Sequence, residues 1–239
     1  MLFLEKSMIQ KLNFLEKKID LIFKNKSLLQ NAFIHRSYLN EHKNYKLPSN
    51  ERLEFLGDSV LSLITSVYLF RNFPYLEEGD YTEIKSAIVK TESLTTSAKN
   101  LGLNEYLLLS KGEDKTGGKT NKNILADCFE ALIGAIFLDA SFEKAYQFVC
   151  RFLFKDRLDQ LVKSKEYLSP KSRLQEIIQG KYKTTPLYRV LSESGPEHKR
   201  IFKIGVFFAG KKLGIGVAPS KKEAEEEAAK KAFENLKNI

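Results

Sequence analysis

The sequence contains only two cysteines, Cys128 and Cys150, in 239 residues. Their separation matches no metal-ligand spacing. So sparse a pair indicates a reducing compartment and no disulfide framework. Cys128 lies in a strongly apolar stretch, where it is most simply a small core residue.

Long apolar runs are also missing. No stretch of about 18 apolar residues occurs, so we expect no membrane span. The N-terminus, Met-Leu-Phe-Leu-Glu-Lys, has neither a long apolar segment nor a small-residue cleavage site, which argues against a signal peptide. Internal repeats and low-complexity tracts are absent as well. We therefore expect a cytoplasmic protein without a membrane partner.

Charge is present in excess but unevenly. The chain has a net charge of +9 and a hydrophobic content of 43%, which is enough to fill a core. Residues 169–239 hold 15 Lys+Arg against 8 Asp+Glu, a net +7, whereas residues 1–168 carry only +2. This asymmetry indicates that the smaller part contacts a polyanion. A solvated basic surface would have the same composition.

The hydrophobic pattern divides the chain into two domains. Residues 1–163 show helical patterns and no strand pattern, so we expect an all-α N-terminal domain, followed by a short linker at 164–168. We expect its helices at 5–24, from Ser27, at 50–70, as one or two at 80–100, and at 142–163. Residues 111–122 are rich in glycine and lysine. A phosphate-binding P-loop is the alternative there, but its glycine spacing is one residue too long and no strand precedes it, so the pattern favours a loop.

The second domain, residues 169–239, has a different pattern. Ser169 and Pro170 are typical of a helix start. A short helix, three alternating strands and a final helix should then follow, with Ser220 as the cap of the last one. We expect these elements at 171–179, 187–193, 200–208, 212–217 and 221–236. This α+β order, α-β-β-β-α, resembles the double-stranded RNA-binding domain.

The stretch of residues 50–61, Asn-Glu-Arg-Leu-Glu-Phe-Leu-Gly-Asp-Ser-Val-Leu, carries an unusual set of acids. On a helix, Glu51, Glu54 and Asp58 fall at roughly 0°, 300° and 340°, one narrow stripe. Like charges at this spacing oppose the helix. Neighbouring cations or a bound metal should offset the repulsion. The opposite face, with Leu53, Leu56, Val60, Ile64 and Val67, is expected to face the core.

A second acidic pair interrupts residues 124–138, which are otherwise apolar almost all round. Asp127 and Glu130 share one side of this helix, where Ala131 and Gly134 would let another helix approach. A buried carboxylate is costly unless it is paired or binds a metal. We therefore expect the two helices to pack together and to direct four or five carboxylates at one point. Oxygen ligands in that number suit Mg²⁺ or Mn²⁺. Salt bridging is the alternative, but Arg52 is the only local cation and lies on another face.

The first acidic stretch resembles the signature motif of the ribonuclease III family. The segment Leu-Ala-Asp-Cys-Phe-Glu-Ala-Leu-Ile-Gly resembles the second acidic motif of the same enzymes, and the likeness covers nearly the whole chain. It implies an endonuclease that hydrolyses double-stranded RNA and leaves 5′-phosphate and 3′-hydroxyl ends with short 3′ overhangs. Precursors of ribosomal RNA and other structured RNAs would be its substrates. Lys85, where many members carry arginine, and Ser49 depart from the family pattern without touching the acids.

The resemblance assigns roles to individual residues. Glu54, Asp58, Asp127 and Glu130 would be metal ligands, with Asp58 and Glu130 also catalytic. Glu51 and Glu78 would support catalysis, although an acidic turn such as the one around Glu78 is usually only solvated. RNA contacts would come from Gln175, Glu176, His198, Ser220, Lys221 and Lys222. Solvated surface lysines and an ordinary loop histidine are the alternatives for the last group.

Phe55 is out of place on the acidic stripe, at roughly 40°. Exposed apolar groups of this kind often mark interfaces. Since the family is homodimeric, we expect Phe55 to insert into a pocket of a partner subunit, unless it folds back over its own helix. The whole chain has two alternative functions. A non-catalytic RNA-binding protein would be expected to lack one or more acids, and a DNA nuclease would not need an RNA-type second domain.

Overall fold

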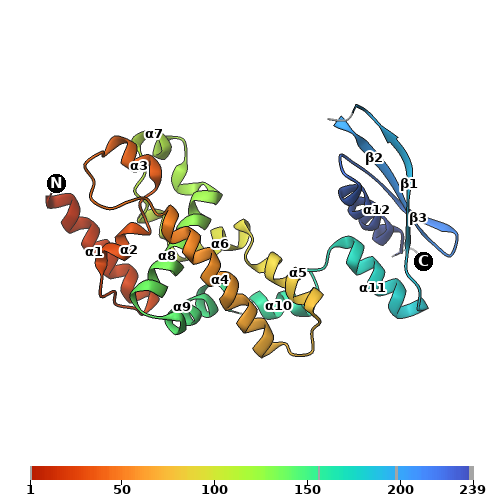
Figure 1. Cartoon of the computed structure of the whole chain (residues 1–239), viewed down its shortest axis with the longest axis horizontal. Coiled ribbons are helices and arrows are strands. Elements are labelled where there is room, and N and C mark those ends of the chain that lie inside the picture. The colour runs from red at the N-terminus through yellow and green to blue at the C-terminus, as the bar shows by residue number, and fades with distance from the viewer. Residues whose placement is uncertain (1, 156, 197–198, 237–239) are drawn as a thin grey trace. The chain divides into compact units, whose positions relative to one another are not determined.

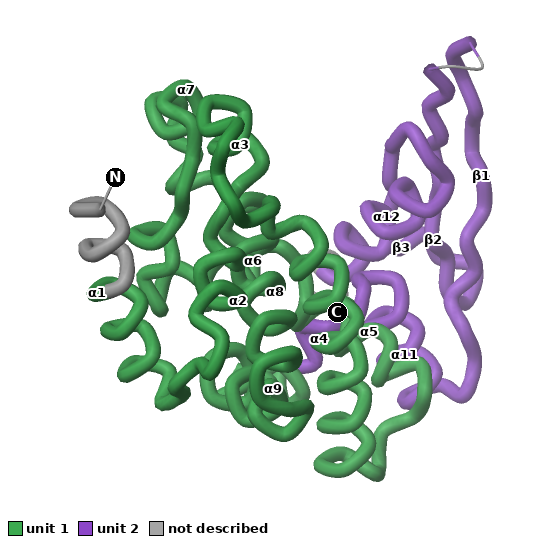
Figure 2. Tube along the Cα trace, turned by 60° about the vertical axis from the view of Figure 1, so that its left-hand side comes forward, with its two compact units in different colours: residues 1–164 green, residues 165–239 purple. Residues whose placement is uncertain are grey.

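The computed structural model describes residues 2–155, 157–196 and 199–236, and it divides the chain into two compact units. Unit 1 comprises residues 1–164 and unit 2 residues 165–239 (Figure 2). The division falls between Ser164 and Lys165. Lys165 forms an ion pair with Glu176 of the second unit, and Tyr167 is buried. The chain after residue 164 is therefore already tied to unit 2.

Unit 1 consists of helices (Figure 1). They are α1 (Leu2–Ile19), α2 (Lys26–Asn31), α3 (Arg36–Glu41), α4 (Glu51–Asn72), α5 (Glu78–Ile88), α6 (Thr91–Leu101), η1 (Leu103–Glu105), α7 (Lys111–Lys115), η2 (Gly118–Thr120), α8 (Lys122–Asp139), α9 (Phe142–Val149), the π-helical η3 (Cys150–Phe154) and α10 (Arg157–Ser164). Its described residues form no strand, only an isolated bridge between Ile34 and Leu108. The all-α expectation is confirmed.

Two expectations within unit 1 were wrong. The single helix expected at 142–163 is three elements, α9, η3 and α10, because a π-helical turn interrupts the apolar period after Val149. The loop expected at 111–122 contains a short helix, α7, whose start is capped by the Ser110 hydroxyl accepting from the Glu113 amide at 3.1 Å. Such a cap stabilises one helical turn in a polar sequence.

The centre of unit 1 is α8, which lies beside α4 (Figure 1). Residues 124–126, 128–129 and 131–136 of α8 are all buried. A Cβ on Gly57 of α4 would lie 1.8 Å from the Glu130 carbonyl oxygen, and one on Gly134 would lie 2.3 Å from the Leu53 carbonyl oxygen. The two helices therefore cross in backbone contact. This confirms the expected close approach and brings their acidic motifs together.

By length and composition alone, α4 is the one described helix that could cross a membrane, with a window of mean hydropathy 1.4. Core helices of soluble proteins meet the same criterion. Seven residues of α4 are buried and the helix packs against α8, whereas its apolar side chains Phe55, Leu63 and Phe70 are exposed.

Unit 2 has the order α11 (Pro170–Tyr182), β1 (Leu187–Ser194), β2 (Ile201–Phe208), β3 (Lys211–Ala218) and α12 (Lys221–Leu236). The strands form one antiparallel sheet in the order β1-β2-β3. Ala209 and Gly210 join β2 to β3 with positive φ at both positions, as a tight hairpin requires. The expected α+β domain is confirmed. Helix α11 runs beyond its expected end, to Tyr182, and α12 ends at Leu236 as expected.

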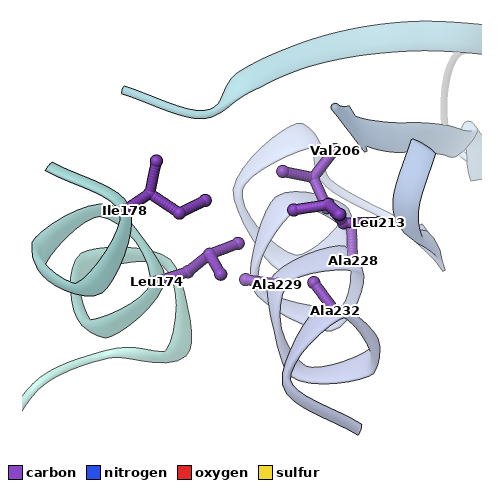
Figure 3. Close-up of a cluster of buried hydrophobic side chains, with 7 residues drawn as sticks. All are labelled: Leu174, Ile178, Val206, Leu213, Ala228, Ala229 and Ala232. Atoms are coloured by element: carbon purple, nitrogen blue, oxygen red, sulfur yellow. The ribbon is translucent and has the colours of Figure 1, made fainter. Parts of the chain in front are cut away.

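The core of unit 2 is small and lies between the sheet and its two helices (Figure 3). It consists of Leu174, Ile178, Val206, Leu213, Ala228, Ala229 and Ala232. Alanines on α12 let the helix sit close to β3. Two glycines of β3 complete the contact, since a Cβ on Gly214 or Gly216 would come within 2.3 Å of a backbone oxygen of α12.

Candidate active site

The buried face of α4 decides which of its acids points inward. Its centre is formed by Leu53, Gly57, Leu61 and Ile64, whereas the expected core residues Leu56 and Val67 are only half-buried. Because Gly57 has no side chain, α8 approaches α4 closely at this point. The face of α4 that contacts α8 is therefore rotated by roughly 50° from the face predicted by its apolar residues. Periodicity of apolar residues missed this because glycine gives no hydrophobic signal. The shift brings Glu54 to the margin of the α8 contact and leaves Glu51 and Asp58 exposed.

Three carboxylates converge where α4 and α8 cross. Glu54 of α4 and Asp127 and Glu130 of α8 each place an oxygen atom within 4.8 Å of the others, a group that could hold a metal ion. All three side chains are half-buried. The Asn121 side chain starts α8 by accepting from the amides of Asn123 and Ile124. The rigid, buried helix then fixes the two α8 carboxylates in place.

Burial and mutual repulsion disfavour the ionised forms of these acids. Burial raises the pKa of Glu130 to about 8, with a further contribution from the charges of Asp58, Asp127 and Glu54. Burial also raises the pKa of Glu54, and the neighbouring acids add to it. Burial also raises the pKa of Asp127, whereas the charge of His35 acts to lower it. Within the described part of the chain, no lysine or arginine pairs with any of the three.

The other predicted acids lie outside this group of three. Asp58 is exposed one turn beyond Glu54, and its charge raises the pKa of both Glu54 and Glu130. Glu51 accepts a 2.6 Å hydrogen bond from the Ser49 hydroxyl and lies 3.8 Å from the Arg36 guanidinium. The local cation is therefore Arg36 rather than Arg52.

Glu78 begins α5 on an exposed position and accepts a 3.1 Å hydrogen bond from the Thr82 hydroxyl. It does not belong to the group of carboxylates that converge, and its role stays a prediction.

In unit 2 the predicted RNA-contacting residues Gln175, Glu176, Lys221 and Lys222 have exposed side chains, and Ser220 is half-buried. Its hydroxyl caps α12 by accepting from the Glu223 amide at 3.2 Å. Lys221 and Lys222 follow in the first turn, where Lys221 lies over the Phe202 ring at 5.5 Å. Gln175 and Glu176 share the outer side of α11. His198 lies outside the described residues.

Comparison with known families accounts for both units. Residues 25–157 match the model of Ribonuclease-III-like domains, and residues 170–236 match the Double-stranded RNA binding motif. The chain belongs to the ribonuclease III family. It is 45% identical to Ribonuclease 3 of Geobacillus sp. (strain WCH70) over 225 residues, 94% of this chain and 91% of the relative. Its identity to Ribonuclease 3 of Treponema denticola is 43% over 98% of this chain and 94% of the relative.

Solved structures agree for unit 1. The nuclease domain of the ribonuclease III from Campylobacter jejuni is 40% identical and covers 60% of this chain and 96% of its own length, with a TM-score of 0.55. Nuclease domain, RNA-binding domain and acidic centre together make the chain a ribonuclease III, an endonuclease of double-stranded RNA.

Two further residues of this ribonuclease III, Phe55 and His35, lie outside the group of three carboxylates. The Phe55 side chain is 79% exposed, so within one subunit it does not fold back into the core. His35 starts α3, and its charge interacts with Glu113, Asp127 and Glu51. Our sequence reasoning gave His35 no role. A histidine before a short polar helix carries no periodic signal, so only the tertiary structure reveals what surrounds it.

Proposed function

We propose that the chain is a Mg²⁺-dependent homodimeric ribonuclease III that cuts both strands of double-stranded RNA. The products would carry 5′-phosphate and 3′-hydroxyl ends with short 3′ overhangs, and Mn²⁺ would substitute for Mg²⁺. The observation that carries the proposal is the convergence of three carboxylates, Glu54, Asp127 and Glu130, with no cationic side chain paired to them in the described structure. Four acids, including the adjacent Asp58, would hold the metal.

The residues present fit a hard divalent cation. Their donors are carboxylate oxygens alone, the ligands that Mg²⁺ and Mn²⁺ prefer. Such clustered acids repel one another, and a bound cation would remove that cost, as the raised pKa of Glu130 indicates. When bound, the metal would neutralise charge on the phosphate and lower the pKa of an attacking water.

The protein's own contribution is to hold the acids in position and to control their protons. Glu130 must lose its proton before it can serve as a ligand, and its raised pKa makes this step dependent on pH near neutrality. Burial of α8 keeps Asp127 and Glu130 from rotating away. Asp58 and Glu51 lie on the solvent side of the same centre, where a substrate strand would enter. Glu78 would support the reaction from α5.

The second domain supplies the anchor for RNA. Lys221 and Lys222 would contact phosphates beside the N-terminal amides of α12, which Ser220 opens. Gln175, Glu176 and His198 would reach minor-groove hydroxyls. We place the catalytic domain at 1–163, the linker at 164–168 and the RNA-binding domain at 169–239. Cytoplasmic precursors of ribosomal RNA and other structured RNAs would be the substrates.

A cleavage assay tests the reaction. The protein should cut 5′-labelled duplex RNA in Mg²⁺ and not in EDTA, and the new ends should accept label only after phosphatase treatment. Duplex DNA of the same sequence serves as the control. RNA binding without cleavage would favour a non-catalytic RNA-binding protein, and equal cleavage of DNA would favour a DNA nuclease.

The homodimer rests on Phe55. A large aromatic side chain that is 79% exposed beside the acidic stripe is costly in a monomer, and a two-fold contact would both cover it and bring two centres to one duplex. Phe55→Asp should shift the protein toward monomer in sedimentation at low micromolar concentration and reduce paired-strand cleavage. Phe14→Ala, at a site 65% exposed on α1, is the control and should leave assembly unchanged. A Phe55→Asp protein that remains fully dimeric would remove Phe55 from the interface.

A further inference from the structure

Lys165, the first residue of unit 2, contacts α11 from the segment that precedes this helix. Its backbone has a left-handed φ of 54°, and its carbonyl accepts from the Leu168 amide at 3.2 Å, so the chain turns back here. Tyr167 lies within the turn and is only 6% exposed, which shows that the turn is packed. The Lys165 ammonium forms a hydrogen-bonded ion pair with the Glu176 carboxylate of α11. The segment at 165–168 therefore ends in a direct contact with the helix.

Glu176 is the only acidic side chain on α11. The nearest basic residue of that helix in sequence order after its start, Lys171, is already paired with Glu225 of α12. Among the described residues, the cation that pairs with Glu176 is thus Lys165, which comes from outside the helix.

The Lys165–Glu176 pair remains open to a ligand. The two side chains are 50% and 48% exposed. Glu176 also lines a hollow of unit 2 together with Gln179, Gly180 and Lys183. An ion pair exposed to this extent adds little to the stability of a fold. Its carboxylate, however, is available to a molecule that enters the hollow.

The charge of Glu176 opposes its predicted role as an RNA contact. A free carboxylate repels the phosphates that the basic residues of unit 2 would attract. Because charges more than about 8 Å apart are largely screened at physiological salt, a cation in direct contact with the carboxylate offsets this repulsion best. Once paired with Lys165, Glu176 belongs to a neutral unit, and its oxygens can still accept a hydrogen bond from a ribose 2′-hydroxyl.

We infer that Lys165 is a positioning residue for RNA binding, which neutralises the Glu176 carboxylate and holds it where it accepts a minor-groove hydroxyl. The inference rests on the RNA-binding surface proposed above. It extends that surface into the segment at 165–168, which lies before the residues that match the RNA-binding motif, 170–236. The segment then takes part in RNA binding and is more than a linker.

A pair of substitutions tests whether Lys165 acts through Glu176. Affinity of the full chain for duplex RNA is measured in Ca²⁺ at about 150 mM salt. Lys165→Gln should weaken it by about 10-fold, because the carboxylate is left unpaired beside the phosphates. Adding Glu176→Gln should restore the affinity to within about twofold of Glu176→Gln alone, since no unpaired carboxylate remains. Lys165→Arg keeps a cation at the same place and should bind as the wild type does.

Two controls separate this effect from net charge and from stability. Lys163→Gln removes the same charge from an exposed position of α10 and should lower affinity by no more than about twofold. Glu143→Gln, added to Lys165→Gln, returns the same net charge from an exposed position of α9 and should restore nothing. Melting temperatures should stay at the wild-type value in Lys165→Gln, because the pair is half-exposed.

Three results would overturn the inference. Equal affinities of Lys165→Gln and Lys163→Gln would mean that Lys165 adds only general charge. Equal restoration by Glu143→Gln and Glu176→Gln would mean that net charge alone governs binding. A loss in Lys165→Gln that persists undiminished beside Glu176→Gln would mean that the lysine does not act through that carboxylate.

Lys221→Gln/Lys222→Gln separates such a failure from failure of the RNA-binding surface itself. If this double variant binds RNA as tightly as the wild type, the surface proposed above is wrong, and the role of Lys165 falls with it. If it binds more weakly, any of the three results counts against Lys165 alone.

Discussion

The two units carry charge in different settings, as a comparison of α8 with α12 shows. On the buried part of α8, residues 124–136, Asp127 and Glu130 are the only acidic or basic side chains. Burial raises the pKa of both. On α12, Lys221 and Lys222 lie exposed beside a face of alanines that forms the core. Half-buried ionisable groups with shifted pKa values are typical of catalytic sites. Exposed positive charge is accessible to a polyanion.

Removing one charge from α8 gives the largest expected effect. Glu130→Gln keeps the size and polarity of the side chain and deletes a carboxylate from the converging group. We expect cleavage of duplex RNA in Mg²⁺ to fall by about 10³-fold. Affinity for the RNA in Ca²⁺ should stay within about twofold, because the anchor lies in unit 2.

Glu143→Gln is the matched control for that substitution, since it makes the same chemical change on an exposed position of α9. It should cleave at the wild-type rate. Wild-type cleavage by Glu130→Gln would show that half-buried charge on α8 serves packing alone, and the contrast between the units would lose its basis.

Removing unit 2 tests whether its exposed positive charge anchors the RNA. A chain ending at Leu168 loses +7 of the net charge of +9. RNA affinity at about 150 mM salt should fall by about 10²–10³-fold, and the slope of log K against log salt should flatten. Cleavage at low salt should persist because the carboxylates remain in unit 1. Binding titrations at several salt concentrations measure both quantities, and an unchanged affinity would mean that unit 1 is the anchor.

The sequence predicted most of the architecture. Alternating residues such as Ile204 and Val206, and the caps Ser169 and Ser220, gave the elements of unit 2 within a few residues, because two-residue periodicity and capping are local signals. The long helices of unit 1 followed from the same reasoning. The interruption after Val149 did not, since a π-helical turn depends on tertiary packing rather than on residue type.

The candidate site was only partly predictable. Both acidic motifs and the packing of their helices could be inferred, because charges on a buried helix are conspicuous. Which acids point inward could not, since Gly57 rotates the contact face of α4 and separates Glu54 from the exposed Asp58. His35 was missed for a related reason. Its charge interacts with that of Asp127, which is 92 residues further along the chain, and no local pattern connects them.

Both units depend on glycines at helix contacts, which offers a third test. Gly57→Ala should destabilise the protein by about 1–3 kcal/mol, because the new Cβ would lie 1.8 Å from the Glu130 carbonyl oxygen. It should also lower Mn²⁺ affinity by moving α4 away from α8. Gly216→Ala should cost a similar amount through its 2.0 Å approach to the Ala224 oxygen, while leaving Mn²⁺ affinity unchanged.

Gly79→Ala and Gly180→Ala are the controls in unit 1 and unit 2. A Cβ at either position meets nothing within 4 Å, so each change should be neutral or stabilise its helix by up to about 1 kcal/mol. Urea denaturation measures all four variants. Equal stabilities for Gly57→Ala and Gly79→Ala would mean that the helices can separate without cost, and the geometry of the acidic centre would not depend on their contact.

The last expected effect is a dependence of stability on pH that has opposite signs in the two units. In unit 1, burial raises the pKa of Glu130 from 4.5 to about 8, so between these values the folded protein binds more protons than the unfolded chain. Without metal, stability should therefore fall as pH rises through this window, by on the order of 1–3 kcal/mol. In unit 2, a hydrogen bond from Lys231 lowers the pKa of the exposed Glu227, so its small contribution is present at neutral pH and lost in acid.

Urea denaturation in EDTA at pH 5 and pH 8.5 tests the sign for unit 1. The wild type should lose stability over this interval relative to Glu130→Gln, in which the titrating group is absent. Glu143→Gln should follow the wild type. Saturating Mg²⁺ should abolish the difference at pH 8.5, because a cation bound to the folded state favours the ionised carboxylate. If instead the wild type gained stability from pH 5 to pH 8.5 relative to Glu130→Gln, Glu130 would be held by a favourable partner, and the acidic centre would resemble the surface ion pairs of unit 2.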